Sequence, residues 1–275
     1  ADPPLPPEDL QGAPMSFTAK DVQALRQATG AGMMDAKRAL TETDGDFDAA
    51  AKSLREKGLA KSVDRSDREN SQGAVAVGSA DGVAVIVELK CETDFVAKSE
   101  EFLAVLDELV AAVVADGSTD AKAERVDDLK VKLKENIDVG RVARLDVAPG
   151  QVVDTYLHKQ EGRGVNAVVV VLDGGDAELA HEVAVSAAFS KPRYLRRDEV
   201  PQADADEERA TLEGITRAEG KPEQAIDKIV EGRLNAWYKD QVLLEQPYAK
   251  DDKQSITQLL GDATIAGFAQ VYIGS

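Results

Sequence analysis

The spacing of apolar residues in the first part of the chain predicts short helices. Apolar positions recur at helical intervals in three segments, and the first two are separated by Gly30–Gly32. Thr18 and Asp21 have the form of a capping box at the start of the first segment. Asp46 is placed to cap the third helix, and Gly58 is expected to end it. Three helices in so short a span predict a compact bundle of the ubiquitin-associated type.

The middle of the chain changes to alternating and continuous apolar runs that are typical of strands. Ala74–Gly78 and Val83–Leu89 form a predicted hairpin with its turn at Asp81–Gly82, and a helical apolar period follows. The pattern recurs with Val152–Leu157 and Val165–Leu172, again followed by a helix. We therefore expect an α+β fold with two similar subdomains, each an antiparallel sheet covered by helices on one face.

A charged helical segment interrupts the second subdomain. A helix over Asp204–Glu219 has few apolar residues, among them Leu212 and Ile215, and Gly220–Pro222 is a predicted reversal. The next helix has apolar residues at intervals of four, four and three. These are Ile226, Val230, Leu234 and Trp237. A narrow apolar seam on two successive charged helices predicts an antiparallel helical hairpin, a short coiled coil that projects from the body.

These patterns set the expected domain boundaries. Residues 1–15 are rich in proline and are expected to be a disordered extension or an expression remnant outside the fold. The other expected parts are the bundle at 16–59, a linker at 60–72, the first core subdomain at 73–148, the second core subdomain at 149–203 and 242–275, and the helical hairpin at 204–241.

The composition of the chain argues against several classes of binding partner. The chain has 275 residues and a net charge of −18, which argues against nucleic acid and against an anionic membrane surface, because both attract clustered cations. No apolar run approaches the ~20 residues that a bilayer-spanning helix needs. Cys91 is the single cysteine, so an internal disulfide is impossible and a reducing cytoplasm is the expected compartment. The expected partner is another protein.

Candidate catalytic groups are few. The two histidines, His158 and His181, have no metal-ligand neighbours at the usual spacing. A Cys91 nucleophile with one of them as base is the single covalent option. The sequence has no phosphate loop, dinucleotide fingerprint or zinc motif. We therefore expect a binding protein that is not an enzyme and that needs no cofactor or metal.

The segment Thr93–Lys98 is the first candidate binding site, because it forms the corner between a predicted buried strand and a helix. Thr93 and Ser99 can each accept a backbone N–H at a helix start. Phe95 is large and apolar at a surface turn, next to Asp94. The side chain either folds back on its own core or serves as an anchor for a partner, and the corner alone leaves both readings open.

A pair of methionines in the helical bundle is the second candidate. Met33 and Met34 begin the second helix after the Gly30–Gly32 loop. Both side chains can be core residues, but adjacent helical residues point about 100° apart, so one of them is expected to stay exposed. An exposed methionine is an adaptable binding surface.

Several motifs together resemble one protein family. Thr29–Asp35, Thr93–Lys98, and Glu219–Pro222 followed by Lys228–Arg233 occur in the order found in bacterial elongation factor Ts. The likeness extends from about Phe17 to Ile273. The sequence departs from the family at three places. These are Ala36, where many relatives have cysteine, Ser186, where some have histidine, and the loop 161–166, which lacks the tighter form of the family.

The resemblance implies a guanine-nucleotide exchange factor for elongation factor Tu in translation. It implies that Asp94 and Phe95, flanked by Thr93 and Val96, displace Mg²⁺ and phosphate contacts in the partner. It also implies that the bundle docks through Gly32, Met33 and Met34. The alternative function is a scaffold or adaptor whose ubiquitin-associated-like bundle binds a protein partner, a role that does not need the Thr93–Lys98 corner.

Overall fold

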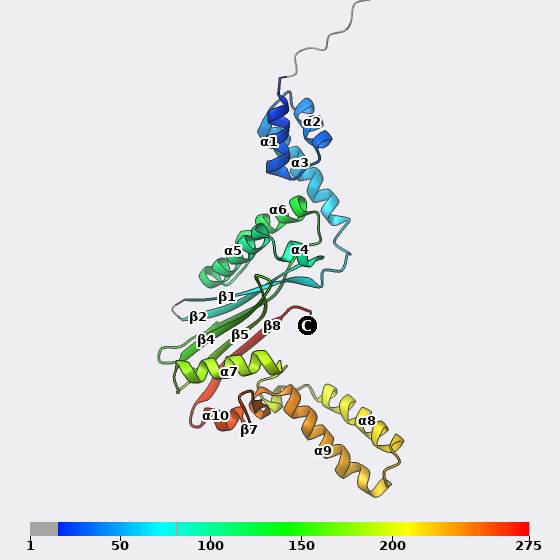
Figure 1. Cartoon of the computed structure of the whole chain (residues 1–275), viewed down its shortest axis with the longest axis vertical. Coiled ribbons are helices and arrows are strands. Elements are labelled where there is room, and N and C mark those ends of the chain that lie inside the picture. Colours follow the sequence, from blue (N-terminus) through cyan, green and yellow to red (C-terminus); the bar gives the residue numbers. More distant parts are fainter. Residues whose placement is uncertain (1–15, 81, 275) are drawn as a thin grey trace, which may run out of the picture. The chain divides into compact units, whose positions relative to one another are not determined.

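The computed structural model describes residues 16–80 and 82–274 (Figure 1). The expected extension at 1–15 and the Asp81 position of the first hairpin turn lie outside the described residues. The described chain combines helices with antiparallel sheets, which confirms the α+β class. The chain divides into two compact units. One joins the chain up to Asn70 with Ala123–Ile137, and the other joins Ser71–Lys122 with the chain from Asp138 onward.

The first unit begins with the three predicted helices, α1 (Ala19–Thr29), α2 (Met33–Glu42) and α3 (Phe47–Val63). The capping box of Thr18 is present, and Asp46 accepts a hydrogen bond from the Ala49 N–H at 2.9 Å. The helices enclose a small core of buried apolar side chains. Its members are Phe17, Val22, Leu25, Ala36, Ala39, Leu40, Ala50 and Leu54.

The expectation that α3 ends at Gly58 is wrong, because α3 continues to Val63. Gly58 allows a close helix contact instead. A Cβ atom there would lie 2.5 Å from Cγ1 of Val131, on α6 (Ala123–Leu133). Arg55 of α3 also donates to Asp128 of α6 at 2.7 Å. Because Gly58 has no side chain, α3 and α6 can pack closely within this unit.

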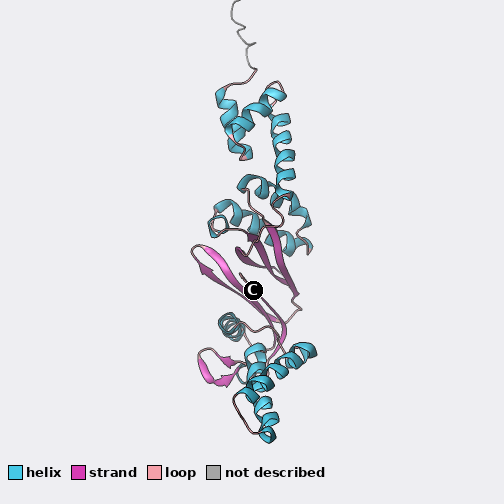
Figure 2. Cartoon of the chain, turned by 90° about the vertical axis from the view of Figure 1, so that its right-hand side faces the viewer, coloured by secondary structure: helices cyan, strands magenta, loops and turns pink. Residues whose placement is uncertain are grey.

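The second unit contains two three-stranded antiparallel sheets. The first sheet has the order β1 (Gln72–Ala80), β2 (Val83–Cys91), β3 (Asp138–Asp146). The second has the order β4 (Val152–Gln160), β5 (Arg163–Asp173), β8 (Thr264–Tyr272). Both predicted hairpins are present and longer than expected. Figure 2 shows the strands in magenta and the helices in cyan.

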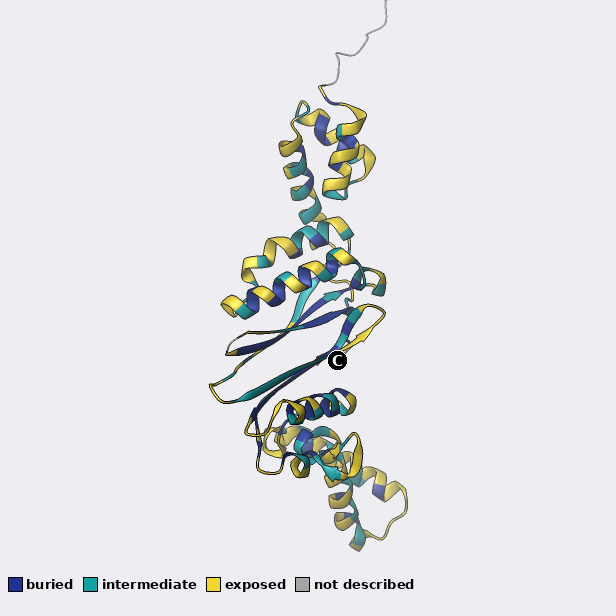
Figure 3. Cartoon of the chain, turned by 60° about the vertical axis from the view of Figure 1, so that its left-hand side comes forward, coloured by how far each residue is buried: buried dark blue, intermediate teal, exposed yellow. Residues whose placement is uncertain are grey.

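One long helix packs on each sheet. Helix α5 (Glu100–Asp116) packs on β1 and β2, and α7 (Ala177–Ser190) packs on β4 and β5. The opposite faces of the two sheets meet in a shared apolar layer. Its buried members are Val75, Ala84, Ile86, Ala167, Val169, Val171 and Val271. Figure 3 shows that the central strands β2 and β5 are largely buried, whereas the edge strands β3 and β4 and the outward sides of the helices are intermediate or exposed.

The charged segment forms two paired helices, α8 (Gln202–Ala218) and α9 (Glu223–Gln241). Ile226, Val230 and Leu234 are buried as expected. Ile215 was expected in the same seam but is 46% exposed, and its neighbour Thr216 is fully buried. The Thr216 hydroxyl donates to the Leu212 carbonyl at 2.7 Å and accepts from Arg233 at 3.1 Å, so its polar group is satisfied inside the seam.

Short elements complete the second unit. These are α4 (Asp94–Ala97), η1 (Asp120–Lys122), η2 (Arg197–Glu199), η3 (Leu243–Glu245), β6 (Pro247–Tyr248), β7 (Asp251–Ser255) and α10 (Ile256–Leu260). Within residues 16–80 and 82–274, the structure has no helix that is both long and apolar enough to cross a bilayer.

Candidate functional site

The corner after β2 is built by two successive helix caps. The Thr93 hydroxyl accepts from the Val96 N–H at 3.3 Å and starts the single turn α4. The Ser99 hydroxyl then accepts from the Phe102 N–H at 3.4 Å and starts α5. Cys91, at the end of β2, and Ala97, the last residue of the turn, are both fully buried. Both predicted caps are confirmed, and they leave a short, well-anchored turn between a buried strand and a buried helix.

Phe95 lies on the outer side of this turn. Its side chain is 81% exposed, whereas a Phe that folds back on its own core would be buried. The reading of Phe95 as a core residue is therefore wrong. Exposing a large aromatic ring to water forgoes the stabilisation that its burial would give. The caps at Thr93 and Ser99 hold the turn without help from the ring, so the ring is available to a partner.

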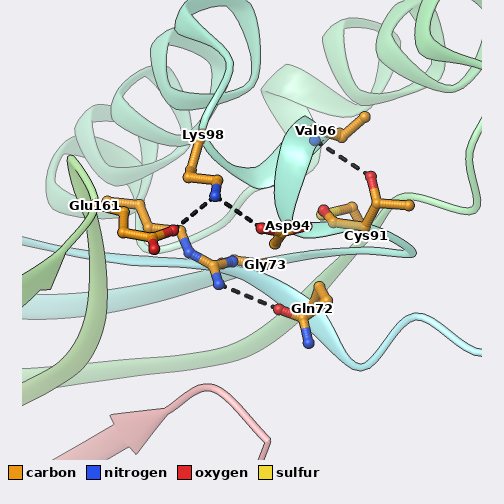
Figure 4. Close-up of polar contacts among 9 residues, drawn as sticks. Gln72, Gly73, Cys91, Asp94, Val96, Lys98 and Glu161 are labelled. Carbon is orange, nitrogen blue, oxygen red and sulfur yellow. Dashed lines mark hydrogen bonds and ion pairs between the residues drawn. The ribbon is translucent and has the colours of Figure 1, made fainter.

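Lys98 connects the corner to a second segment of the unit (Figure 4). Its ammonium group lies 2.7 Å from Asp94 and 2.6 Å from Glu161, the first residue of the turn between β4 and β5. The hydrogen bond from Lys98 lowers the pKa of Asp94 below its ordinary value, so this carboxylate is ionised at neutral pH. Asp94 and then Glu161 raise the pKa of Lys98. The corner thus presents an anionic group directly beside an exposed aromatic ring.

The second candidate lies at the start of α2. Gly32 is the N-cap residue and its backbone carbonyl accepts from the Ala36 N–H, but no side chain caps the helix. Met33 is 48% exposed and Met34 is 74% exposed. Both side chains are therefore exposed, whereas the sequence predicts exposure of one of them. The buried face of α2 is formed by Ala36, Ala39 and Leu40, and Met33 and Met34 precede it at the start of the helix.

Comparison with known proteins gives the family. Residues 92–275 match the family described as "Elongation factor TS". Proteins named "Elongation factor Ts" from Clavibacter michiganensis and Mycobacterium ulcerans are 43% and 44% identical to the chain, with 94% of the chain covered in both and 99% and 98% of the relatives. The protein of that name from Micrococcus luteus is 42% identical over 280 residues. The chain belongs to the elongation factor Ts family.

The family match includes the whole corner, since it begins at Glu92. The corner and the Met33–Met34 surface belong to different compact units of the structure. Each is therefore a separate candidate contact surface of this elongation factor Ts family member, with its own supporting structure.

The covalent option is disfavoured by the geometry. Cys91 is fully buried, and its thiol donates to the Thr93 carbonyl at 3.2 Å. His158 lies 3.5 Å from the Tyr156 hydroxyl, and His181 lies 3.2 Å from Asp154. Neither contact connects a histidine to the thiol. Among the described residues no group of three His, Cys, Asp or Glu side chains is placed to hold a metal ion.

Sequence reasoning missed Glu161 and Phe189. Glu161 and Gly162 form a two-residue turn that their neighbours could have indicated, but the contact to Lys98 joins segments far apart in the chain. Phe189 lies in an apolar stretch of α7, yet it is 79% exposed near the end of that helix. Phe189 also lines a cavity of about 460 Å³ with Tyr156, His158 and Tyr272.

Proposed function

We propose that this protein is a guanine-nucleotide exchange factor that promotes GDP release from elongation factor Tu during translation elongation. Membership of the elongation factor Ts family supports the proposal. The structural observation that carries it is the exposed Phe95 beside ionised Asp94, on a corner held by its own caps. A scaffold or spacer has no need of such a corner.

The exchange step needs no covalent chemistry. A GTPase holds GDP through Mg²⁺ and through backbone N–H groups around the phosphates. A protein that binds more tightly when those contacts are displaced lowers the affinity for GDP, and GDP lowers the affinity for that protein by the same factor. In this proposal Phe95 enters the partner beside the phosphate site, with Thr93 and Val96 holding the turn. The Asp94 carboxylate then competes with the phosphate oxygens for the cation.

Burial of one aromatic ring in the partner gives a substantial binding free energy, but not enough to account for exchange alone. Full burial of a Phe side chain stabilises a complex by roughly 1.5–3 kcal/mol. At about 1.4 kcal/mol for each factor of ten, that corresponds to roughly 10- to 150-fold in affinity. The remaining stabilisation must come from other surfaces, for which Met33 and Met34 are two exposed apolar candidates in the first unit.

We assign roles to the other parts on the same basis. The bundle of α1, α2 and α3 acts as a ubiquitin-associated-like docking module, which binds the partner through Gly32, Met33 and Met34. The α8–α9 hairpin acts as a short coiled coil that adds a secondary contact. For these roles we propose the bundle expected at 16–59, whose last helix α3 continues to Val63, and the hairpin expected at 204–241. Nucleic acid and membranes have no part in the proposal.

The deciding experiment measures the release of a fluorescent GDP analogue from elongation factor Tu. Addition of this protein in catalytic amounts, with excess unlabelled GDP present to refill the emptied site and displace the factor, should accelerate release of the label. The alternative function is a scaffold that binds through the helical bundle. A scaffold would bind elongation factor Tu or another partner without changing the release rate, and that result would reject the exchange function.

A further inference from the structure

The turn between β4 and β5 reaches the exposed corner from another part of the second unit. Glu161 is 69% exposed, and its carboxylate lies 2.6 Å from the ammonium group of Lys98. The same ammonium group lies 2.7 Å from Asp94 and 5.7 Å from the centre of the Phe95 ring, within the usual range of a cation–π contact. Lys98 thus contacts both residues that the exchange mechanism uses, and Glu161 holds Lys98 from the far side.

Glu161 is able to act as a fixed anchor because its hairpin is fastened to the first sheet. Arg163, directly after the turn, donates to the Gly73 carbonyl at 2.5 Å and to the Gln72 side chain at 3.1 Å. At Gly164 a Cβ atom would lie 2.2 Å from the Val75 carbonyl oxygen, so glycine permits the hairpin to approach β1 this closely. The position of Glu161 is therefore set by the packing of the two sheets.

The backbone of Glu161 is unfavourable for its residue type. Its φ is 50°, and Gly162 has a φ of 85°, as in the two-residue turns that prefer Asn or Gly at the first position. A non-glycine residue in this left-handed region is strained, and such strain gathers at functional positions. Asn would suit the turn better than Glu, yet Asn has no charge to offer Lys98.

We propose that Glu161 is a positioning residue for nucleotide exchange, which acts through Lys98 to fix the side chains of Asp94 and Phe95 on the capped turn before the GTPase binds. The inference rests on the exchange function proposed above. Because Glu161 is 69% exposed, its ion pair with Lys98 contributes little to folding, so stability does not explain why a strained Glu occupies this turn. Ordering the Lys98 side chain in advance removes a cost that binding would otherwise include.

The expected effect follows from that cost. Immobilising one long side chain on binding corresponds to about a 2- to 10-fold change in an equilibrium or rate constant. Glu161→Gln should therefore slow the apparent second-order rate of fluorescent GDP release from elongation factor Tu by about 2- to 10-fold. Its urea midpoint should match the wild type. Glu178→Gln is the matched control, because Glu178 is an exposed carboxylate in the first turn of α7, away from the corner.

Glu161→Asn separates positioning from folding. The change relieves the backbone strain and should raise the urea midpoint, while it slows GDP release as much as Glu161→Gln does. A purely structural role predicts the opposite, because a more stable protein would then exchange at least as well. Release at the wild-type rate by both Glu161 variants would overturn the inference.

A double-mutant cycle tests the route through Lys98. In a Lys98→Met background, Glu161→Gln should have no further effect on GDP release, because its contact is already lost. An undiminished effect in that background would overturn the proposed route. The wild-type protein distinguishes failure of the exchange function from failure of the inference about Glu161. If it does not accelerate release at all, the exchange function fails, whereas normal wild-type exchange with silent Glu161 variants rejects this inference alone.

Discussion

Phe95 and Phe102 lie on consecutive helices, α4 and α5, yet Phe95 is 81% exposed while Phe102 is fully buried. The Ser99 cap between them turns the chain, so that one ring faces solvent and the other enters the core. The two residues have the same side chain in the same stretch of sequence. They therefore form an internal control for separating binding from folding.

We predict that Phe95→Ala lowers the acceleration of GDP release by roughly 10- to 150-fold, since the partner loses a buried ring. The free energy of unfolding should change by about 0.5 kcal/mol or less, because the ring is exposed in the free protein. Phe102→Ala should instead cost about 3–5 kcal/mol of folding stability. Urea melts and release assays of both variants check this. An early-melting Phe95→Ala protein with normal exchange would contradict the proposed role of Phe95.

We predict that replacing Met33 and Met34 together by Ala weakens binding to elongation factor Tu. Both side chains are exposed on α2 and available to a partner, and α2 keeps its buried face of Ala36, Ala39 and Leu40. Val63→Ala is the matched control, because Val63 is an exposed apolar residue at the end of α3 in the same unit. Calorimetric titration gives the affinity, and circular dichroism checks the fold. Unchanged affinity in a folded double variant would remove this pair from the interface.

Features that depend on neighbouring residues are predicted correctly from the sequence, whereas features that depend on contacts between distant segments are not. The caps at Thr18, Asp46 and Ser99 are confirmed because each depends only on neighbouring residues. Gly58 is wrongly predicted to end α3 because Val131, the residue against which it packs, lies far away in the sequence, on α6. The exposure of Phe95 was undecided for the same reason. Whether a surface ring has a pocket to enter depends on the packing of the whole unit.

The apolar seam of the α8–α9 hairpin and the Asp94–Phe95 corner show the same limit of prediction from the sequence. At Ile215 and Thr216, helical spacing placed the apolar residue inside, whereas the structure buries the threonine. The Arg233 contact that makes this possible crosses between the two helices. Likewise, Asp94 was identified from its neighbours, but the contact between Lys98 and Glu161 depends on how two hairpins pack. Charge pairs between distant segments leave no periodic trace in a sequence.

We predict a late-titrating tyrosine at position 248. The hydrogen bond to Glu182 and burial raise the pKa of Tyr248 to about 12. A raised pKa means that the stabilisation is complete below the ordinary value near 10 and is lost as the pH rises through about 12. Tyr248→Phe should therefore cost about 1 kcal/mol at neutral pH, and the difference from wild type should shrink above pH 10. Urea melts against pH measure it, and a constant difference up to pH 12 would contradict the assignment.

We predict that the α8–α9 hairpin is separable from the rest of the second unit. Replacing Asp206–Trp237 by a short Gly–Ser linker removes the seam of Ile226, Val230 and Leu234. The change keeps Asp204, which accepts from the Tyr194 hydroxyl at 3.0 Å, and Tyr238, whose ring lies 4.2 Å from the Arg197 guanidinium.

The shortened protein should keep a cooperative urea transition, because the removed side chains mainly bury one another. GDP release should be slowed only in part, since the Asp94–Phe95 corner and the Met33–Met34 surface are intact. As a control with the full hairpin, Arg233→Met removes the contacts to Glu219 at 2.7 and 2.9 Å and loosens the pairing of α8 with α9. Its release rate should lie between those of the wild type and the shortened protein. Complete loss of exchange by a folded, shortened protein would show instead that the hairpin itself drives nucleotide release.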